Sequence, residues 1–400
     1  MTMKVRALLV ASVLLAEIWL AGCGHYTCGT TFGASSCSPS GGGVSQGGGG
    51  TGTGATYLFV ADAGGIQGEV LDATAGTIKI TPGFGTVSVP NVPSEWMAIA
   101  NAEFMYVGYP STGQIYGWSI AGSGTLTFLN GGTPFSAPYL VSSTLGGSQA
   151  MITNPAGTLL LVLDTTLDQV HVYQIGTAGL LTEGSTSPVT MPSGFKPYNM
   201  AIDGLGKYLY VSNLVGLRTT EVATYSIGSA GALTAVGSPI LTPIQQMQGE
   251  SSGKFMIGTS GGTIFNTGDQ NLYVGSIGQS GVLTVTQTPT AGVPAGVAVQ
   301  PNTGGNIVYS FDFPGSAGNG SIEGFQLSLS TGALTAIAGI TASGANGRFD
   351  QSGKYLFVVE SSNNIASALD AYSVSASPAL TTPLATVGWA PGAWSVVDTP

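Results

Sequence analysis

Side chains able to transfer protons or attack a substrate are few in this chain. Its 400 residues contain only two histidines, His25 and His171, and nine Lys and Arg together. His171 lies in residues 168–173 (DQVHVY), whose alternating pattern is typical of a strand. No serine–histidine–aspartate set can be assembled around it, and the sequence holds no HxH or HExxH zinc pattern. We expect a packed or surface strand histidine, no metal and no cofactor.

The apolar segments that must position any site recur seven times. Each copy has an apolar strand, a second strand after a loop, and a small-residue turn ending in Leu-Thr, such as AGALT at 230–234. A period near 50 residues with strands only predicts an all-β, seven-bladed β-propeller of four-stranded antiparallel blades over residues 57–400. The first residues of the repeated strands are Tyr57, Phe104, Leu159, Tyr208, Phe255, Ile307 and Tyr355.

The first copy begins in mid-repeat, because Tyr57 opens a second strand with no first strand before it. The missing piece stands at the other end of the chain, where residues 394–398 (WSVVD) match residues 199–203 (NMAID) of the fourth copy. We therefore expect the C-terminal strand to close the first blade and to remove an open sheet edge.

The N-terminus is typical of an export signal. Lys4 and Arg6 precede an apolar stretch over residues 7–20, and residues 20–23 (LAGC) resemble a bacterial lipobox. The resemblance implies a lipoprotein signal peptide over 1–22, acylation of Cys23 and a Gly/Ser-rich tether to residue 56. Gly24 in place of Asp favours the outer membrane of the bacterial cell envelope. The alternative is an ordinary secretory signal followed by a chance cysteine.

Two further cysteines, Cys28 and Cys37, lie in the segment before the repeats. Export places them in an oxidising compartment, where they either close a small disulfide loop or remain free thiols. No CxxC pair points to a metal.

Charge excludes several classes of partner. Charged residues make up 7% of the chain and the net charge is −10 at pH 7. A body this acidic does not attract nucleic acid or anionic lipid, so a membrane would be reached through the lipid anchor alone. We expect a monomeric propeller.

Residues 207–213 (KYLYVSN) and 354–358 (KYLFV) resemble the repeat of the lactonase-type seven-bladed propellers, the 6-phosphogluconolactonase and YVTN-repeat group. The resemblance covers about residues 57–398. It implies a site at the mouth of the central channel, where the loops that enter the first strands and those that join strands two and three converge. Enzymes of this group carry an Arg followed by a His at the mouth, with a Glu at the end of a second strand.

Neither an Arg nor a His occupies the equivalent positions of this chain. Arg348 falls two positions after the arginine slot and should lie within a strand, and Glu360 falls one position early for the glutamate, on the other strand face. The arginine slot holds Glu95, Gln149, Tyr198, Gln245, Ala295, Ala345 and Ala393, and the histidine slot holds Trp96, Ala150, Asn199, Gln246, Gly296, Asn346 and Trp394.

The aromatic and amide residues at the mouth suit a neutral polar ligand such as a glycan or a peptide, since rings stack on apolar faces and amides bind hydroxyls. The alternative is that the aromatics plug the channel and the amides bond to neighbouring loops. The candidates are Trp96, Trp394, Tyr198, Gln149, Gln245, Gln246, Asn199 and Asn346. Carboxylates near second-strand ends, at Asp62, Asp164, Asp312 and Glu360, could hold a hard cation, but we expect them to cap turns.

These observations leave three functions open. The first is a non-catalytic, lipid-anchored propeller that binds a ligand or protein on the cell envelope. The second, which rests on the resemblance alone, is a lactonase in which Glu95 would be the base and Lys196 would anchor an anion. The third is a structural element of an envelope assembly.

Overall fold

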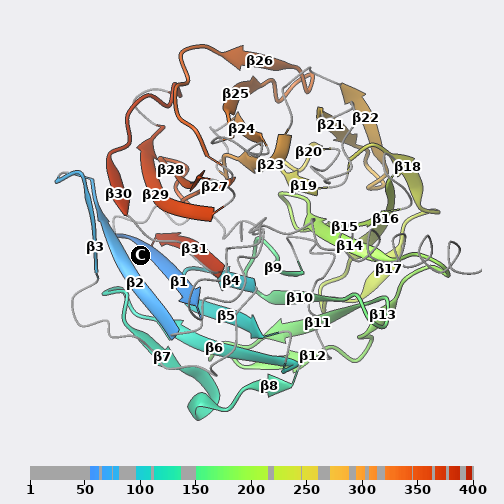
Figure 1. The fold of residues 1–400 in the computed structure, drawn as a ribbon. Coiled ribbons are helices and arrows are strands. Elements are labelled where there is room, and N and C mark those ends of the chain that lie inside the picture. The colour runs from blue at the N-terminus through green and yellow to red at the C-terminus, as the bar shows by residue number, and fades with distance from the viewer. Residues whose placement is uncertain are drawn as a thin grey trace, which may run out of the picture.

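The computed structural model shows a ring of seven small β-sheets around a central axis (Figure 1). It describes residues 55–62, 65–73, 75–80, 96–109, 112–136, 150–214, 220–244, 246–259, 271–287, 294–301, 306–312, 320–344, 346–362, 365–374, 378–387 and 393–398. The predicted fold class, an all-β seven-bladed propeller with four-stranded antiparallel blades, is confirmed. The described residues contain no helix of the length and apolarity that crossing a bilayer requires.

Each blade is numbered by its order along the chain, and its strands run from the axis to the rim. The innermost strands of blades 1 to 7 are β31 (Ala393–Asp398), β4 (Trp96–Ala100), β9 (Met151–Thr153), β14 (Pro197–Ile202), β19 (Gln246–Gly249), β23 (Pro294–Val299) and β27 (Asn346–Phe349). The second strands are β1 (Thr56–Asp62), β5 (Phe104–Tyr109), β10 (Leu159–Asp164), β15 (Tyr208–Leu214), β20 (Phe255–Thr259), β24 (Ile307–Asp312) and β28 (Tyr355–Ser362).

The outer two strands complete each sheet. The third strands are β2 (Gly65–Asp72), β6 (Gln114–Ile120), β11 (Gln169–Ile175), β16 (Thr220–Ile227), β21 (Leu272–Ile277), β25 (Ile322–Leu327) and β29 (Ile365–Ser373). The fourth strands are β3 (Thr77–Ile80), β7 (Leu126–Phe128), β12 (Leu181–Glu183), β17 (Leu233–Ala235), β22 (Leu283–Gln287), β26 (Leu334–Ile337) and β30 (Ala385–Val387). Blades 2, 3 and 4 add a short strand to the third one, respectively β8 (Phe135–Ser136), β13 (Val189–Thr190) and β18 (Ile240–Thr242), and η1 (Leu129–Gly132) is a 3-10 turn.

The inner strands are apolar on both faces because a blade lies on each side of every sheet. Every residue of β4 and of β10 is buried. Such strands read as continuous apolar runs rather than as alternating ones. Most of the free energy that holds the ring together therefore comes from apolar surface buried between blades.

Turns between the first and second strands are stabilised by a repeated side-chain cap. In blade 4, Asp203 Oδ1 accepts the backbone N–H groups of Lys207 and Tyr208, both at 2.6 Å. Burial raises the pKa of Asp203, and these hydrogen bonds act against that rise. Three other blades place an equivalent acceptor at this turn, in the side chains of Asn154, Glu250 and Asp350.

A glycine in the turn between the third and fourth strands packs against the preceding blade. Gly281 of blade 5 has φ = 85°, and a Cβ there would lie 2.4 Å from the ring of Tyr208 in blade 4. Only glycine tolerates both the backbone angle and the close approach. The same contact joins Gly124 to Tyr57, Gly179 to Phe104, Gly231 to Leu159 and Gly332 to Phe255.

Tyrosine hydroxyls reinforce this contact between blades. The hydroxyls of Tyr106 and Tyr210 donate to the carbonyls of Gly179 and Gly281, each at 2.8 Å. Burial raises the pKa of both phenols far above the ordinary value, so they remain donors. Tyr309 of blade 6 donates in the same way to the carbonyl of Pro378 in blade 7, where the turn has no glycine.

The two ends of the propeller share one sheet, as predicted. Strand β31 pairs with β1 in antiparallel register from Thr56 opposite Asp398 to Ala61 opposite Ala393. Blade 1 is therefore ordered β3-β2-β1-β31, with its innermost strand supplied by the C-terminus (Figure 1).

Deletion of residues 392–400 should lower the melting temperature of the whole propeller by at least about 10 °C, since it removes a strand from blade 1 and exposes the edges of blades 1 and 7. Thermal unfolding followed by circular dichroism measures this. Deleting nine residues from the glycine-rich segment, 45–53, is the matched control. Equal melting temperatures in the two deletion variants would contradict closure by β31.

Candidate functional site

One ion pair identifies the mouth of the channel. Lys196 precedes the innermost strand of blade 4, and its Nζ forms an ion pair with Asp168, in the loop between the second and third strands of blade 3. The loops that enter the first strands and those that join the second and third strands therefore emerge on one face, as expected. Lys196 is exposed, and its backbone N–H donates to Asn213 Oδ1 at 3.1 Å. Because the carboxylate of Asp168 already neutralises it, Lys196 is a weak anchor for an anion.

Tyr198 lies at a β-bulge in the mouth. The register of β14 against β15 shifts between Pro197 and Asn199, so that Tyr198 has no partner in the ladder. Bulges re-aim a side chain at the end of a strand. Burial raises the pKa of the Tyr198 phenol to about 12, so it is a hydrogen-bond donor and not a base at neutral pH.

Trp96 begins β4 and is buried. Its side chain is 8% exposed and belongs to an apolar cluster with Ala150 and Met151 of blade 3. This placement fits packing between blades better than stacking on a ligand. Trp394 lies in β31 opposite Val60, and its side chain is outside the described residues.

The described amides of the mouth are half-buried or buried. Asn199 is fully buried, and its backbone carbonyl accepts the Ser212 hydroxyl at 3.4 Å. Gln246 is half-buried opposite Thr259 in blade 5. Asn346 Oδ1 accepts the N–H of Gly347 at 2.8 Å in blade 7. Glu95, Gln149, Gln245, Cys23, Cys28 and Cys37 lie outside the described residues.

Arg348 lies within β27, as predicted, and away from the mouth slots. It is 5% exposed and lies opposite Phe357, which packs against Leu58 and Val60 of blade 1. Its side chain therefore belongs to the interface of blades 7 and 1. Burial lowers the pKa of the guanidinium to about 9.

Second-strand carboxylates bond locally. Asp164 Oδ1 accepts the N–H groups of Thr166 and Leu167 at 2.8 and 3.0 Å, which is the turn cap predicted for it. Asp312 accepts the hydroxyl of Ser321. No group of three His, Cys, Asp or Glu that could hold a metal occurs among the described residues.

Glu360 and Asp370 form a carboxyl pair in blade 7. Asp370 is buried and accepts the hydroxyls of Tyr372, at 3.1 Å, and Thr386. Burial, followed by the charge of Asp370 and a hydrogen bond with it, raises the pKa of Glu360. The neighbouring carboxylate of Asp370 therefore favours the protonated form of Glu360.

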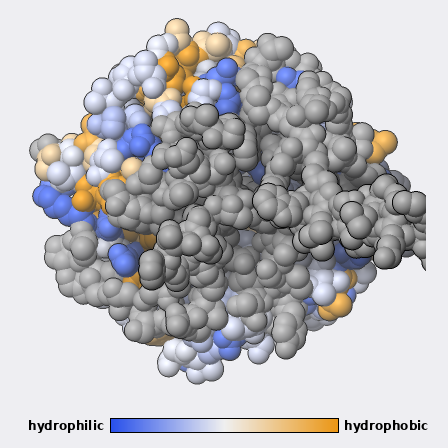
Figure 2. Space-filling model, in the orientation of Figure 1, coloured by the Kyte–Doolittle hydropathy of each residue, from blue (hydrophilic) through white to orange (hydrophobic). Residues whose placement is uncertain are grey.

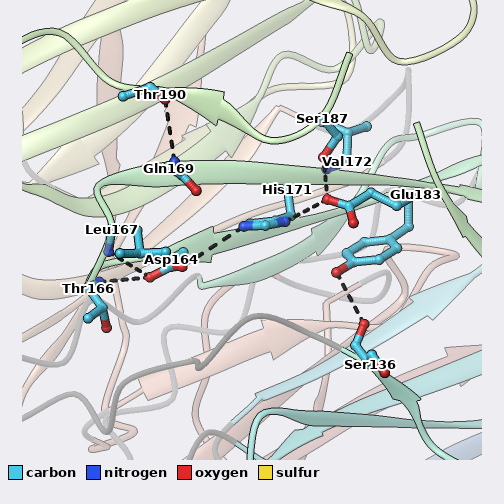
Figure 3. Close-up of polar contacts among 11 residues, drawn as sticks. Ser136, Asp164, Thr166, Leu167, Gln169, His171, Val172, Glu183, Ser187 and Thr190 are labelled. Atoms are coloured by element: carbon cyan, nitrogen blue, oxygen red, sulfur yellow. Dashed lines mark hydrogen bonds and ion pairs between the residues drawn. The ribbon is translucent and has the colours of Figure 1, made fainter. Parts of the chain in front are cut away.

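His171 is 6% exposed and lies between two carboxylates of blade 3 (Figure 3). Its Nδ1 is 2.7 Å from Glu183 Oε1, and its Nε2 is 3.9 Å from Asp164 Oδ2. The Ser187 hydroxyl donates to Glu183 Oε1 at 2.8 Å and accepts the N–H of Val172. The chain of contacts thus runs serine, glutamate, histidine, aspartate.

This order does not activate a nucleophile, because a carboxylate separates the serine from the imidazole. The stacked Tyr173 donates to the carbonyl of Ser136 in blade 2, so the cluster lies at the interface of blades 2 and 3 (Figure 3). We assign it to packing between blades. The contacts of His171 with Glu183 and Asp164 were not predicted from the sequence, because strand register alone brings these residues together.

In the view of Figure 2, hydrophobic and hydrophilic residues are interspersed on the surface of the described residues. Among the described residues, the large exposed apolar side chains belong to blades 3, 4 and 5 and are Leu167, Leu180, Leu205, Leu241 and Val282.

Solved structures share this fold at low sequence identity. A protein of Bacteroides fragilis, provisionally named a 6-phosphogluconolactonase, superposes with a TM-score of 0.62 at 18% identity, covering 88% of this chain and 100% of its own. The fold is that of the 6-phosphogluconolactonase-like propellers. The periplasmic gluconolactonase of Pseudomonas aeruginosa has a TM-score of 0.60 at 15% identity, covering 86% and 100%. A Lactobacillus plantarum protein has a TM-score of 0.61 at 16% identity, covering 86% and 99%.

No family model matches the chain, and no curated protein matches it.

The Glu360 carboxyl should make stability depend on pH. Its pKa is raised in the folded protein above the unfolded value of about 4.5, so its contribution is fully present below pH 4.5 and is lost as pH rises through the folded pKa. Glu360→Gln should therefore increase the free energy of unfolding at pH 7 and flatten its dependence on pH above 4.5. Urea unfolding from pH 4 to 8 measures this, with exposed Glu103→Gln as the control. Parallel profiles for the wild type and Glu360→Gln would refute the assignment.

Proposed function

We propose that this protein is an exported, lipid-anchored propeller that binds a neutral polar ligand, a glycan or a peptide, or an envelope protein at its mouth without catalysing a reaction. The fold supports a lactonase-like scaffold, and propellers of one fold carry many functions. The function must therefore be argued from the residues of the mouth.

The observation that carries the proposal is the pair Tyr198 and Asn199 in blade 4. These two positions correspond to the Arg and His of the enzymes that the repeat resembles. They hold a bulged phenol whose pKa is about 12 and a fully buried amide. Neither group exchanges a proton at neutral pH, and the half-buried Tyr198 phenol can hydrogen bond with a hydroxyl or a peptide group.

Export and anchoring are supported by the N-terminus. Residues 20–23 (LAGC) follow a positively charged start and an apolar stretch. A structural neighbour is named a periplasmic gluconolactonase. Acylation at Cys23 would hold the propeller on the envelope through the segment that precedes β1. Recovery of mature protein in the aqueous fraction without detergent would contradict the anchor.

A lactonase is the second candidate, and the names of two structural neighbours favour it. Glu95 would act as the base in such an enzyme. Its anion anchor, Lys196, is already paired with Asp168, which weakens this alternative.

The purified protein should hydrolyse 6-phosphogluconolactone no faster than buffer does, because the described residues in the arginine and histidine slots of the mouth offer no group suited to proton transfer at neutral pH. A pH-stat measurement at several enzyme concentrations tests this. Glu95→Gln should leave the rate unchanged. A rate that scales with protein concentration and is lost in Glu95→Gln would establish the lactonase instead.

A photoreactive amino acid at position 198 should crosslink a glycan or protein in intact envelopes, since Tyr198 lies at the mouth. The matched control carries it at Leu241, which is 70% exposed on β18 at the rim. Mass spectrometry identifies the products. Identical products from both positions would remove the mouth as the binding surface.

A further inference from the structure

The interface between blades 5 and 6 brings together, near the axis, strands β19 and β20 of blade 5 and strands β23 and β24 of blade 6 (Figure 1). In blade 5, Gln248 lies opposite Ile257 and Gln246 lies opposite Thr259. Opposite residues of an antiparallel pair lie on the same face of the sheet. Ile257 packs against Val299 of blade 6, so this face of blade 5 is the one that meets blade 6.

Blade 6 presents Ser310 to the same interface. Ser310 lies opposite Val297, and Val308 lies opposite Val299. Val308 and Val299 belong to the apolar cluster with Ile257, so Ser310, two residues along β24 from Val308, lies on the face that meets blade 5. Thr259 and Ser310 therefore approach one interface from opposite sides.

The interface changes from apolar to polar toward the mouth. Gln248 joins the blades, because its Oε1 accepts the N–H of Val299 at 3.0 Å. Gln248 is 7% exposed, and Thr259 and Ser310 are fully buried. Yet Gln248 Nε2, Thr259 Oγ1 and Ser310 Oγ have no hydrogen-bond partner within the part of the chain that the structure describes.

Three such groups at one interface are costly. A buried donor or acceptor without a partner destabilises the folded state by about 1–3 kcal/mol, and native proteins satisfy nearly all such groups. Hydrophobic residues of similar shape would avoid this cost, as valine and isoleucine do nearer the opposite end of the same strands. The polar residues therefore suit a site that receives a hydrogen-bonding molecule.

The chemistry of these groups limits what that molecule can be. The amide donates, and each hydroxyl both donates and accepts. Glu323 lies opposite Ser310 on the same face and is half-buried, which adds a carboxylate that would repel an anion. The side chains that face one another across this interface thus match a small uncharged molecule with several hydroxyls.

We propose that the mouth-side part of the interface of blades 5 and 6 is a binding site for a small polyhydroxy compound, a sugar or a polyol. Its hydroxyls would bond with Gln248 Nε2, Thr259 Oγ1 and Ser310 Oγ. The site is distinct from Tyr198 and Asn199 in blade 4. It goes beyond the proposed function, because the unsatisfied groups are there whether or not the mouth binds a ligand.

The test uses thermal unfolding of the full-length mature protein with D-glucose, myo-inositol and D-glucitol as probes. The variant Thr259→Val/Ser310→Ala removes both hydroxyls and nearly preserves shape. The control is Ser276→Ala in blade 5, whose exposed hydroxyl donates to the carbonyl of Thr284 at 3.3 Å. Because polyols stabilise any protein weakly through exclusion from its surface, the signal sought is a saturable rise in melting temperature.

At least one probe should raise the melting temperature of the wild type, the control and Tyr198→Ala to a plateau. The double variant should need at least about tenfold more probe. Without probe, its melting temperature should equal or exceed that of the wild type, since it removes unsatisfied buried hydroxyls. An equal probe response in the double variant, no saturable rise in the wild type, or a lower melting temperature of the double variant without probe would each overturn the proposal. A saturable response lost only in Tyr198→Ala would place binding at the mouth instead.

Discussion

Five of the seven junctions between blades depend on the contact between a glycine of one blade and the first apolar residue of the second strand of the blade before it. Gly281 against Tyr208 shows the constraint most fully: a positive φ, no room for a Cβ, and hydroxyls of two tyrosines bonded to the same turn. This contact fixes the distance and the angle between neighbouring blades near the rim. Apolar inner strands then close the space toward the axis.

The two sides of this contact, the apolar strand start and the turn glycine, also make the fold predictable from the sequence. The repeated apolar strand starts and the repeated Gly-x-Leu-Thr turns are the two sides of one contact, so their common period reports the blade. The shared sheet of β1 and β31 followed from Tyr57 opening a second strand. The short strands β8, β13 and β18 were not predicted, because two or three residues at a rim carry no periodic pattern.

The mouth was harder to predict than the fold. Its place followed from the repeat, and Arg348 was rightly placed within a strand. The burial of Trp96 was left as one of two alternatives, since a tryptophan at a strand end suits a core and a ligand equally. The ion pair of Lys196 with Asp168 and the carboxylates beside His171 were missed, because each joins residues from different strands or blades.

The bulge at Tyr198 has no signal of its own in the sequence. Blade 6 has the same irregularity between Pro294 and Gly296, so the two blades share a proline at the start of the innermost strand and an extra residue after it. Proline lacks the N–H that a regular ladder needs, which favours a break in register there. The bulge after the proline is recognised by comparing the blades of one structure, and the sequence of a single blade does not indicate it.

The position of β1 has a mechanical consequence. It is flanked by β2 on one side and by β31 on the other, with six residue pairs in each ladder. A force transmitted through the chain that enters at Ala55 acts along the length of this strand. Two ladders then resist in shear and must rupture together, rather than opening one hydrogen bond at a time as in a peeled edge. The entry point of the chain is thus one of the strongest places at which the propeller could be pulled.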